Sequence, residues 1–400
     1  MKKLFYLAIV LCAIACTNKK SSVNYAKFEP EDGKCLVFIG QDMEAIGGIE
    51  GKEGYINFFG TPAGITIYTN IRPGDVSYGY TYQGLDGLTS NANWGAGNCF
   101  ADAQLASPLL KGCDVAIGLE LVNHEEKVAS GEHDSYIIRL GEWIQNIAPR
   151  RVFLRIGYEF DGHAWNHYQP EAYITAFRRI HTLFDSLNIS NVAYVWQSTG
   201  GNSSMDELYQ YYPGDEYVDW IGVSSFLKKD FLNSLAVEDG SEVCTTRESQ
   251  IYFTLGDFGY TTNSLKYITD FMKENNINKP LAISEGGVVS RISYSDENID
   301  LWGEKRVRNM YWYAAMRFPQ LKSIVYFNQD MESEVIGFDL SFKPNYTQII
   351  EEAITTGPYL LSYNETPKYT FVKADGGRTY NSDYIPIYGY VYQPEQYTNY

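Results

Sequence analysis

Two glutamates, Glu159 and Glu285, each follow a short apolar stretch of the kind that forms a buried strand. Gly162 lies shortly after the first acid, and two glycines follow the second. Glycine at a strand end permits tight backbone geometry and leaves room for a ligand. Two carboxylic acids that face one cavity are the groups that hydrolyse a glycosidic bond. The chain therefore carries the side chains for that chemistry, provided that the fold brings them together.

Strand alternation predicts how the first acid is supported. Side chains on a strand point to opposite faces in turn, so Arg155, Gly157 and Glu159 share one face. An arginine one layer below Glu159 can hold a neighbouring carboxylate ionised and fix its rotamer. The alternatives are structural: Glu159 would be a solvent-exposed loop acid, and Glu285 a helix-capping acid in an ordinary loop.

The elements that must position these acids alternate along the chain. A helical pattern begins at Pro170 and presents an apolar face from Tyr173 to Leu187. Three further helices are expected at 133–147, at 264–275 with Asn263 as N-cap, and at 303–318. Strands alternating with helices indicate a parallel sheet, and eight such units predict a (β/α)8 TIM barrel. An open doubly wound sheet is the alternative, although no G-x-G-x-x-G motif follows a strand. The eight expected strands are 35–40, 64–69, 114–122, 151–158, 191–197, 218–224, 281–284 and 323–327.

Several expected connections are long: 41–62, 71–100, 159–169 and 225–262. They would lie at the C-terminal face of the barrel, where barrel enzymes keep their sites. Glu120, on the third strand, is the main rival to the chosen pair of acids. Each further candidate has buried packing or a structural hydrogen bond as its alternative. The candidates for hydrogen bonds to substrate are Gln41, Asp42, Tyr158, Gln197 and Asn328, and those for stacking on sugars are Trp94, Trp165, Tyr168, Trp196 and Phe226.

The composition of the chain limits the classes of molecule that it can be expected to bind. The net charge of −17 argues against nucleic acid, whose phosphates need Lys and Arg, and disfavours polyanionic substrates. The 34 tyrosines raise the aromatic share to 15%, which suits stacking on sugars as well as packing. With five histidines and no C-x-x-C or H-E-x-x-H spacing, we expect no metal and no cofactor. The expected partner is a neutral polysaccharide or oligosaccharide, and the expected state is a monomer.

The beginning of the chain predicts export. Two lysines, an apolar stretch and small residues before Cys16 resemble the signal of a bacterial lipoprotein, with Cys16 as the lipidated residue. We therefore expect an exported, membrane-anchored lipoprotein that meets the membrane only through its lipid. The expected divisions are a signal at 1–16, a polar linker at 17–33, a barrel at 34–356 and a Tyr-rich C-terminal extension at 357–400. In an oxidising compartment, Cys99 and Cys113 are the pair we expect to form a disulfide.

The motifs around both acids resemble glycoside hydrolase family 26. The family places an Arg four residues before its acid/base Glu, a Gly three residues after it and a Trp shortly beyond, and Arg155, Glu159, Gly162 and Trp165 fit those places. The segment 212–222 resembles the approach to strand six, and the segment that ends at Glu285 resembles the nucleophile strand. Two positions depart from the family. Tyr158 replaces a His, and the segment 224–226, Ser-Ser-Phe, stands where other members offer an aromatic residue near the nucleophile.

This resemblance implies a retaining, endo-acting glycoside hydrolase with Glu285 as nucleophile and Glu159 as acid/base. β-Mannan is the first substrate it suggests, followed by β-1,3/1,4-glucan and β-1,3-xylan. Retention requires two carboxyls about 5–5.5 Å apart, and the pKa of the acid/base must be raised. Two alternatives remain: a surface glycan-binding lipoprotein that keeps the barrel without catalysis, and a structural or adhesive surface protein.

Overall fold

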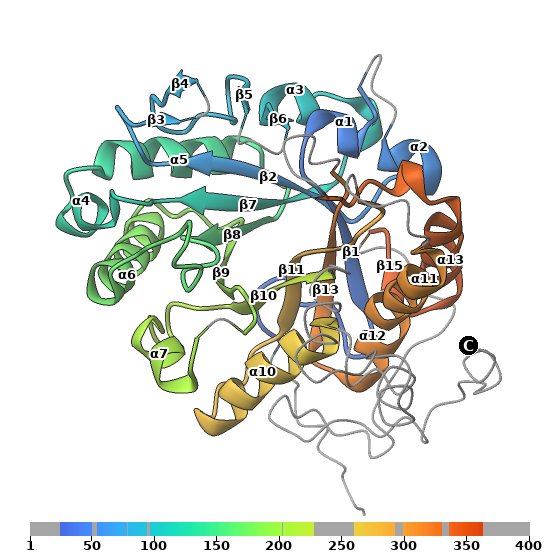
Figure 1. The fold of residues 1–400 in the computed structure, drawn as a ribbon. Coiled ribbons are helices and arrows are strands. Elements are labelled where there is room, and N and C mark those ends of the chain that lie inside the picture. Colours follow the sequence, from blue (N-terminus) through green and yellow to red (C-terminus); the bar gives the residue numbers. More distant parts are fainter. Residues whose placement is uncertain are drawn as a thin grey trace, which may run out of the picture.

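Eight parallel strands form a closed barrel with the helices outside it (Figure 1). A computed structural model describes residues 25–49, 54–77, 79–93, 97–201, 203–227, 260–292, 299–329 and 336–362. β13 pairs with β1 and closes the barrel, so the (β/α)8 fold is confirmed and the open sheet is excluded. The barrel strands are β1 (Cys35–Gly40), β2 (Gly64–Asn70), β7 (Asp114–Glu120), β8 (Val152–Ile156), β9 (Val192–Ser198), β10 (Trp220–Leu227), β11 (Leu281–Val288) and β13 (Leu321–Phe327).

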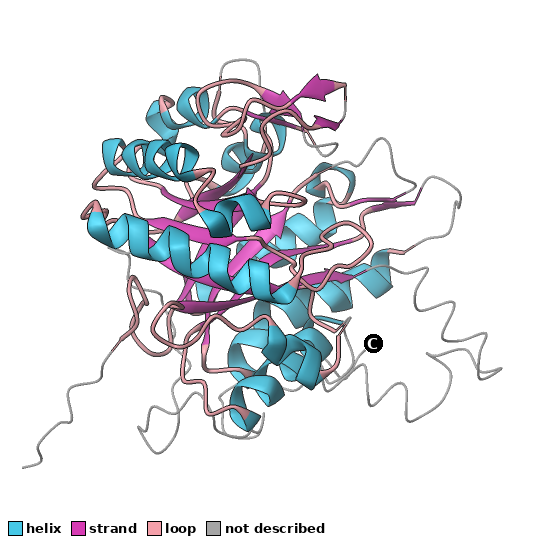
Figure 2. Ribbon diagram, turned by 90° about the vertical axis from the view of Figure 1, so that its left-hand side faces the viewer, coloured by secondary structure: helices cyan, strands magenta, loops and turns pink. Residues whose placement is uncertain are grey.

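The helices cover the outer face of the barrel (Figure 2). α6 begins at Pro170, whose fixed φ suits the first helical turn, and buries Tyr173, Phe177, Ile180 and Phe184 along one face. The main helices are α4 (Glu125–Ser130), α5 (Asp134–Asn146), α6 (Pro170–Ser186), α7 (Met205–Gln210), α10 (Tyr260–Glu274), α11 (Asp300–Arg308), α12 (Ala314–Arg317) and α13 (Pro344–Thr356). Shorter helices are α1 (Met43–Ile46), α2 (Tyr55–Phe59) and α3 (Ala101–Leu105).

Two expected helices differ in detail. The helix expected at 264–275 begins four residues earlier, at Tyr260, so Asn263 does not cap it. The helix expected at 303–318 is divided, because a π-helical segment, Asn309–Tyr313, separates α11 from α12. Apolar periodicity does not show such a change in hydrogen-bond pattern. Among the described residues, no helix combines the length and apolarity that a membrane crossing requires.

Aromatic side chains fill the lower part of the barrel lumen. Phe153 on β8 makes edge-to-face contacts with Phe28, Phe38 and Trp220, at ring-centroid distances of 5.9, 5.5 and 5.3 Å. Leu36, Ala116, Ala193, Val195, Ala282 and Val325 complete this buried cluster. The lumen is therefore a packed core below the strand ends rather than a channel.

Residues from both ends of the described chain close the bottom of the barrel. The indole of Trp220 donates to the carbonyl of Lys27 at 2.8 Å, and the fully buried ammonium of Lys322 lies 2.9 Å from Asp32 Oδ1. Residues 25–33 of the expected linker thus pack against the barrel. β15 (Tyr359–Leu360), inside the expected C-terminal extension, adds to β1. Because the bottom is closed, a site in this barrel would lie at the other end, where the carboxyl ends of the strands are.

The expected Cys99–Cys113 disulfide is wrong. Cys113 precedes β7 at the bottom of the barrel and is a free thiol that donates to the carbonyl of Pro62 at 3.2 Å. Cys99 follows the loops above β2, and its thiol lies 3.4 Å from the carbonyl of Gln41, beyond the end of β1. The two thiols therefore lie at opposite ends of the barrel. Their short separation in the sequence does not indicate this distance.

Phe153→Ala should lower the free energy of unfolding by about 3–5 kcal/mol, because a large ring is removed from a lumen that its neighbours cannot refill. Urea unfolding followed by tryptophan fluorescence measures this change. Phe58→Ala is the matched control, since Phe58 is 57% exposed and should change stability little. A Phe153→Ala variant as stable as the control would contradict this account of the lumen.

Candidate active site

Glu159 stands on a turn beyond β8 rather than on the strand itself. β8 ends at Ile156, and Gly157 then takes a φ of +54°, where a Cβ would lie 2.6 Å from the ring of Tyr173. Glu159 has a φ of +51°, a left-handed conformation that costs a non-glycine residue about 1–3 kcal/mol. Backbone strain of this kind persists where surrounding contacts enforce it, as at functional sites.

Hydrogen bonds to the following loop hold this turn in place. The amide of Gly162 donates to the carbonyl of Glu159 at 2.8 Å, and the Asn166 side chain donates to the carbonyl of Tyr158 at 2.7 Å. Asp161 is fully buried and accepts from the Ser198 hydroxyl and the Thr199 amide, both at 2.7 Å. The loop that carries Glu159 is therefore fastened to the end of β9.

Glu285 reaches the lumen through an irregularity in β11. Val223 of β10 pairs with Ile283, but Ser224 pairs with Glu285, so Ser284 is an extra residue between them. Ala282 lies in the lumen cluster and Ile283 in the outer core, so strict alternation would direct Glu285 outward. The extra residue reverses that direction. Arg155 Nη1 then donates to Glu285 Oε1 in a buried ion pair.

A continuous series of hydrogen bonds joins the two acids. Arg155 Nη1 donates to Gln197 Oε1 at 3.0 Å, and Gln197 Nε2 donates to Ser224 Oγ at 3.0 Å. Ser224 Oγ in turn donates to Glu159 Oε1 at 2.5 Å. We call the five residues Glu285, Arg155, Gln197, Ser224 and Glu159 the acid bridge. It joins the side chains of both acids at the carboxyl end of the barrel strands.

The two acids differ in their surroundings. Burial and, after it, the negative charge of Glu285 raise the pKa of Glu159 to about 8. Hydrogen bonds from Ser224 and from the Trp165 indole, whose Nε1 lies 2.9 Å from Glu159 Oε2, act in the opposite direction. Glu285 has the Arg155 guanidinium as a direct partner. The surroundings of Glu159 therefore favour its protonated form, whereas Glu285 forms an ion pair with a guanidinium.

Two tyrosines enclose Arg155. The guanidinium carbon lies 4.9 Å from the ring centroid of Tyr68 and 5.3 Å from that of Tyr158, and the rings meet edge to face at 5.4 Å. Aromatic faces favour a cation placed over them, which offsets part of the cost of burying Arg155. Tyr158, one of the candidates from the sequence, thus lies beside Arg155. Tyr68 was missed because it lies inside an apolar strand with no neighbouring signal.

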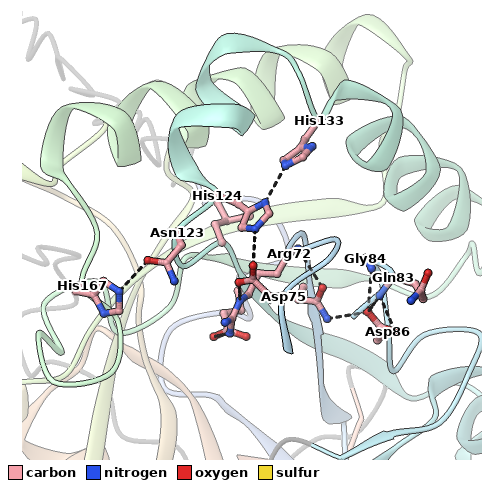
Figure 3. A network of polar contacts seen from close by, with 12 residues as sticks. Arg72, Asp75, Gln83, Gly84, Asp86, Asn123, His124, His133 and His167 are labelled. Atoms are coloured by element: carbon pink, nitrogen blue, oxygen red, sulfur yellow. Dashed lines mark hydrogen bonds and ion pairs between the residues drawn. The ribbon is translucent and has the colours of Figure 1, made fainter. Parts of the chain in front are cut away.

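Glu120, the rival acid, pairs outside the acid bridge. Arg72 Nη1 lies 2.6 Å from Glu120 Oε1, and Arg72 Nε lies 3.0 Å from Asp75 Oδ2. His124 contacts Asp75 at 3.1 Å and His133 at 2.9 Å (Figure 3). These contacts tie the loop after β2 to α4 and α5. Glu120 is therefore neutralised by a structural network, which favours Glu159 and Glu285 as the reactive pair.

Several other candidates serve the scaffold. Asn328 does not offer its amide to the cleft, because Nδ2 donates to Ala45 and Oδ1 accepts from Leu340. Phe226 packs with Phe327 and Phe338 in an apolar cluster. Trp196 and Tyr168 are buried and bond to backbone groups, and Asp42 caps α1 while Gln41 is buried. Trp94 and Cys16 lie outside the described residues.

Sequence reasoning missed Ser224 and Asp161 as members of the site. Ser224 was noted only as a departure from an aromatic residue, and Asp161 only as part of a motif. Their partners, Glu159 and Ser198, come from other strands. Only the barrel closure brings such residues together, so the sequence carries no direct signal for either contact.

Comparison with known proteins identifies related chains. The model of glycosyl hydrolase family 26 matches residues 118–287. The β-1,3-xylanase TXYA of a Vibrio species is 28% identical over 284 residues, covering 66% of this chain and 55% of the relative. A β-1,3-xylanase of an Alcaligenes species is 29% identical over 232 residues, covering 58% and 45%. This chain thus spans about half the length of these curated relatives.

A solved structure supports the fold. The family 26 β-mannanase BoMan26A of Bacteroides ovatus matches with a TM-score of 0.51 at 13% identity, covering 84% of this chain and 93% of that chain. At this identity the likeness concerns the barrel architecture alone.

Removing the charge of Glu285 should lower the pKa of Glu159 from about 8, because the repulsion between the two acids is lost. Carboxyl-detected ¹³C NMR of Glu159 in wild type and in Glu285→Gln measures both values. Glu120→Gln is the control, since Glu120 pairs with Arg72 and not with the bridge. An unchanged Glu159 titration in Glu285→Gln would show that the acids do not interact.

Proposed function

Because the chain belongs to glycosyl hydrolase family 26, we propose that it is a retaining glycosidase that cuts within a neutral β-linked polysaccharide. The observation that carries this proposal is the acid bridge, which joins Glu159 to Glu285 at the same end of the barrel. The raised pKa of Glu159 and the ion pair of Glu285 suit the two different roles that the reaction needs.

In the first step, Glu285 attacks the anomeric carbon while Glu159 gives its proton to the glycosidic oxygen. The bond between the anomeric carbon and that oxygen breaks, and the leaving sugar departs with a hydroxyl. The products are a glycosyl ester on Glu285 and an ionised Glu159. Arg155 supports this step by keeping Glu285 ionised and by fixing the rotamer of its carboxylate.

In the second step, Glu159 takes a proton from water, and the water oxygen attacks the anomeric carbon. The ester bond breaks, and Glu285 returns as a carboxylate beside Arg155. Because Glu285 carries no charge while it is esterified, its contribution to the raised pKa of Glu159 is absent at this stage. The pKa of Glu159 is then lower, which favours the carboxylate form that a general base needs.

Retention is supported by the position of Ser224. This residue pairs in register with Glu285 on the adjacent strand, at a strand spacing of about 4.8 Å. The same residue bonds directly to Glu159. We infer from these two contacts that about one strand spacing separates the two carboxyls, which suits the ~5–5.5 Å of retaining enzymes better than the ~6.5–9.5 Å of inverting enzymes.

For the substrate, we propose β-1,3-xylan first and β-mannan second. The sequence motifs suggested β-mannan, but the two curated relatives at 28% and 29% identity are β-1,3-xylanases. The mannanase structure, at 13% identity, does not bear on the substrate. Trp165 is 50% exposed and bonds to Glu159, which places an aromatic surface beside the leaving-group side of the site.

Glu285→Ala should abolish the release of reducing ends from β-1,3-xylan, because no group remains to form the ester. A reducing-end assay on β-1,3-xylan, β-mannan and mixed-linkage β-glucan compares this variant with wild type. Glu120→Gln serves as control and should retain activity. Glycan binding by wild type without cleavage would support the alternative of a non-catalytic glycan-binding protein, and neither binding nor cleavage would support a structural role.

Glu159→Gln should reduce cleavage of xylan or mannan by at least ~10²-fold, because the sugar leaving group needs a proton. Aryl glycosides with activated leaving groups need no such proton, so formation of the glycosyl ester from them should fall much less. Stopped-flow release of the aryl alcohol measures this step directly. If the loss were equal for both classes of substrate, Glu159 would not be the acid.

A further inference from the structure

Ser224 occupies an unusual place between the acid and the rest of the bridge. Its hydroxyl is buried, with 4% of the residue exposed, and lies 2.5 Å from Glu159 Oε1 and 3.0 Å from Gln197 Nε2. It stands where the family resemblance leads one to expect an aromatic residue. A serine hydroxyl can both donate one hydrogen bond and accept two, whereas an aromatic ring carbon can do neither.

The partners of Ser224 fix the direction of each hydrogen bond. A guanidinium only donates, so Arg155 turns the oxygen of the Gln197 amide toward itself and leaves Nε2 to donate to Ser224. Gln197 therefore occupies one of the two acceptor positions of the hydroxyl. Its hydrogen and its other acceptor position remain for Glu159.

The other oxygen of Glu159 has a partner that cannot reverse. Trp165 Nε1 lies 2.9 Å from Glu159 Oε2, and an indole N–H donates but never accepts. Oε2 must therefore remain an acceptor in every protonation state that keeps this bond. Because the carbonyl oxygen of a carboxylic acid is its stronger acceptor, this bond favours the proton of neutral Glu159 on Oε1, the oxygen that faces Ser224.

We propose that Ser224 is a positioning residue that holds Glu159 Oε1 in both protonation states, donating to the carboxylate and accepting from the carboxylic acid. This inference rests on the proposed function for its role in turnover. When Oε1 gives its proton to the glycosidic oxygen, the Ser224 hydroxyl rotates and donates to the new carboxylate. When Oε1 takes a proton from water, the hydroxyl rotates back, so neither step leaves Oε1 without a partner.

The charged groups that face Glu159 are the same with or without the Ser224 hydroxyl. They are Glu285 on β11 and Asp161 on the loop of Glu159, which raise the pKa of Glu159, and Arg155 on β8, which pairs with Glu285. The hydrogen bond from Ser224 lowers the pKa of Glu159 because it favours the charged form. Its removal should raise that pKa above about 8 without altering any charge.

The neighbouring residue provides a matched control. Ser225 is also buried, with 1% of the residue exposed, and its hydroxyl has no hydrogen-bond partner in the structure. It pairs with Gly286, one position beyond Glu285. Ser225→Ala therefore removes the same atom from the same strand without touching the acid bridge, and Ser224→Thr keeps a hydroxyl at the proposed position.

The test is the titration of Glu159 by carboxyl ¹³C NMR in the ligand-free protein, together with the pH profile of kcat/KM. In Ser224→Ala the Glu159 pKa and the basic limb of the profile should both move up by about one pH unit. The acidic limb of the pH profile for glycosyl-ester hydrolysis should also move up by about one pH unit, since the general base acts only where it is ionised. Ser225→Ala should match wild type. Ser224→Thr, which keeps the hydroxyl, should return the Glu159 pKa and the pH profile most of the way to their wild-type values.

Two outcomes separate this inference from the proposed function. An active wild type whose Glu159 titration is the same in Ser224→Ala and Ser225→Ala would overturn the role of Ser224 and leave the glycosidase intact. An inactive wild type whose Glu159 still titrates higher in Ser224→Ala would contradict the glycosidase and support the Ser224 contact.

Discussion

The buried ion pair between Arg155 and Glu285 is the interaction on which the rest of the site depends. Two carboxylic acids that share one poorly solvated space cannot both be ionised cheaply. The guanidinium of Arg155 on β8 favours the ionised form of Glu285, because it bonds directly to that acid. It is connected to Glu159 only through Gln197 and Ser224. Burial and the charge of Glu285 then raise the pKa of Glu159. A double displacement requires such a difference between its two acids.

The scaffold supplies rigidity on both sides of this pair. Below it, Phe153 and its aromatic neighbours fill the lumen, and residues from both ends of the described chain close the bottom. Beside it, Asp161 fastens the loop of Glu159 to β9, so that the strained turn at Glu159 cannot relax. Stacking of Arg155 between Tyr68 and Tyr158 lowers the cost of burying a charge there.

The sequence was sufficient to predict the barrel, because each apolar run of strand length can be recognised by itself. Two of these runs drew attention to the two acids, because each of the two ends on a carboxylic acid. The sequence was not sufficient for the directions of the side chains. Alternation would turn Glu285 outward, and only the extra residue at Ser284 turns it inward. Strand alternation also does not give the direction of Glu159, because this residue follows the end of β8 and has a left-handed backbone conformation. Contacts between strands, such as Ser224 with Glu159, and the opposite locations of Cys99 and Cys113 depend on closure of the barrel and have no local signal.

The central claim is that Glu285 forms a covalent bond to the sugar while Glu159 moves the proton. Trapping with an activated 2-deoxy-2-fluoro glycoside of the preferred sugar, followed by peptide mass spectrometry, tests it most directly. The account predicts one adduct, on the peptide that contains Glu285, and none in Glu285→Ala. An adduct on Glu159 or Glu120, or rapid turnover of a substrate with inversion and no trapped ester, would contradict it.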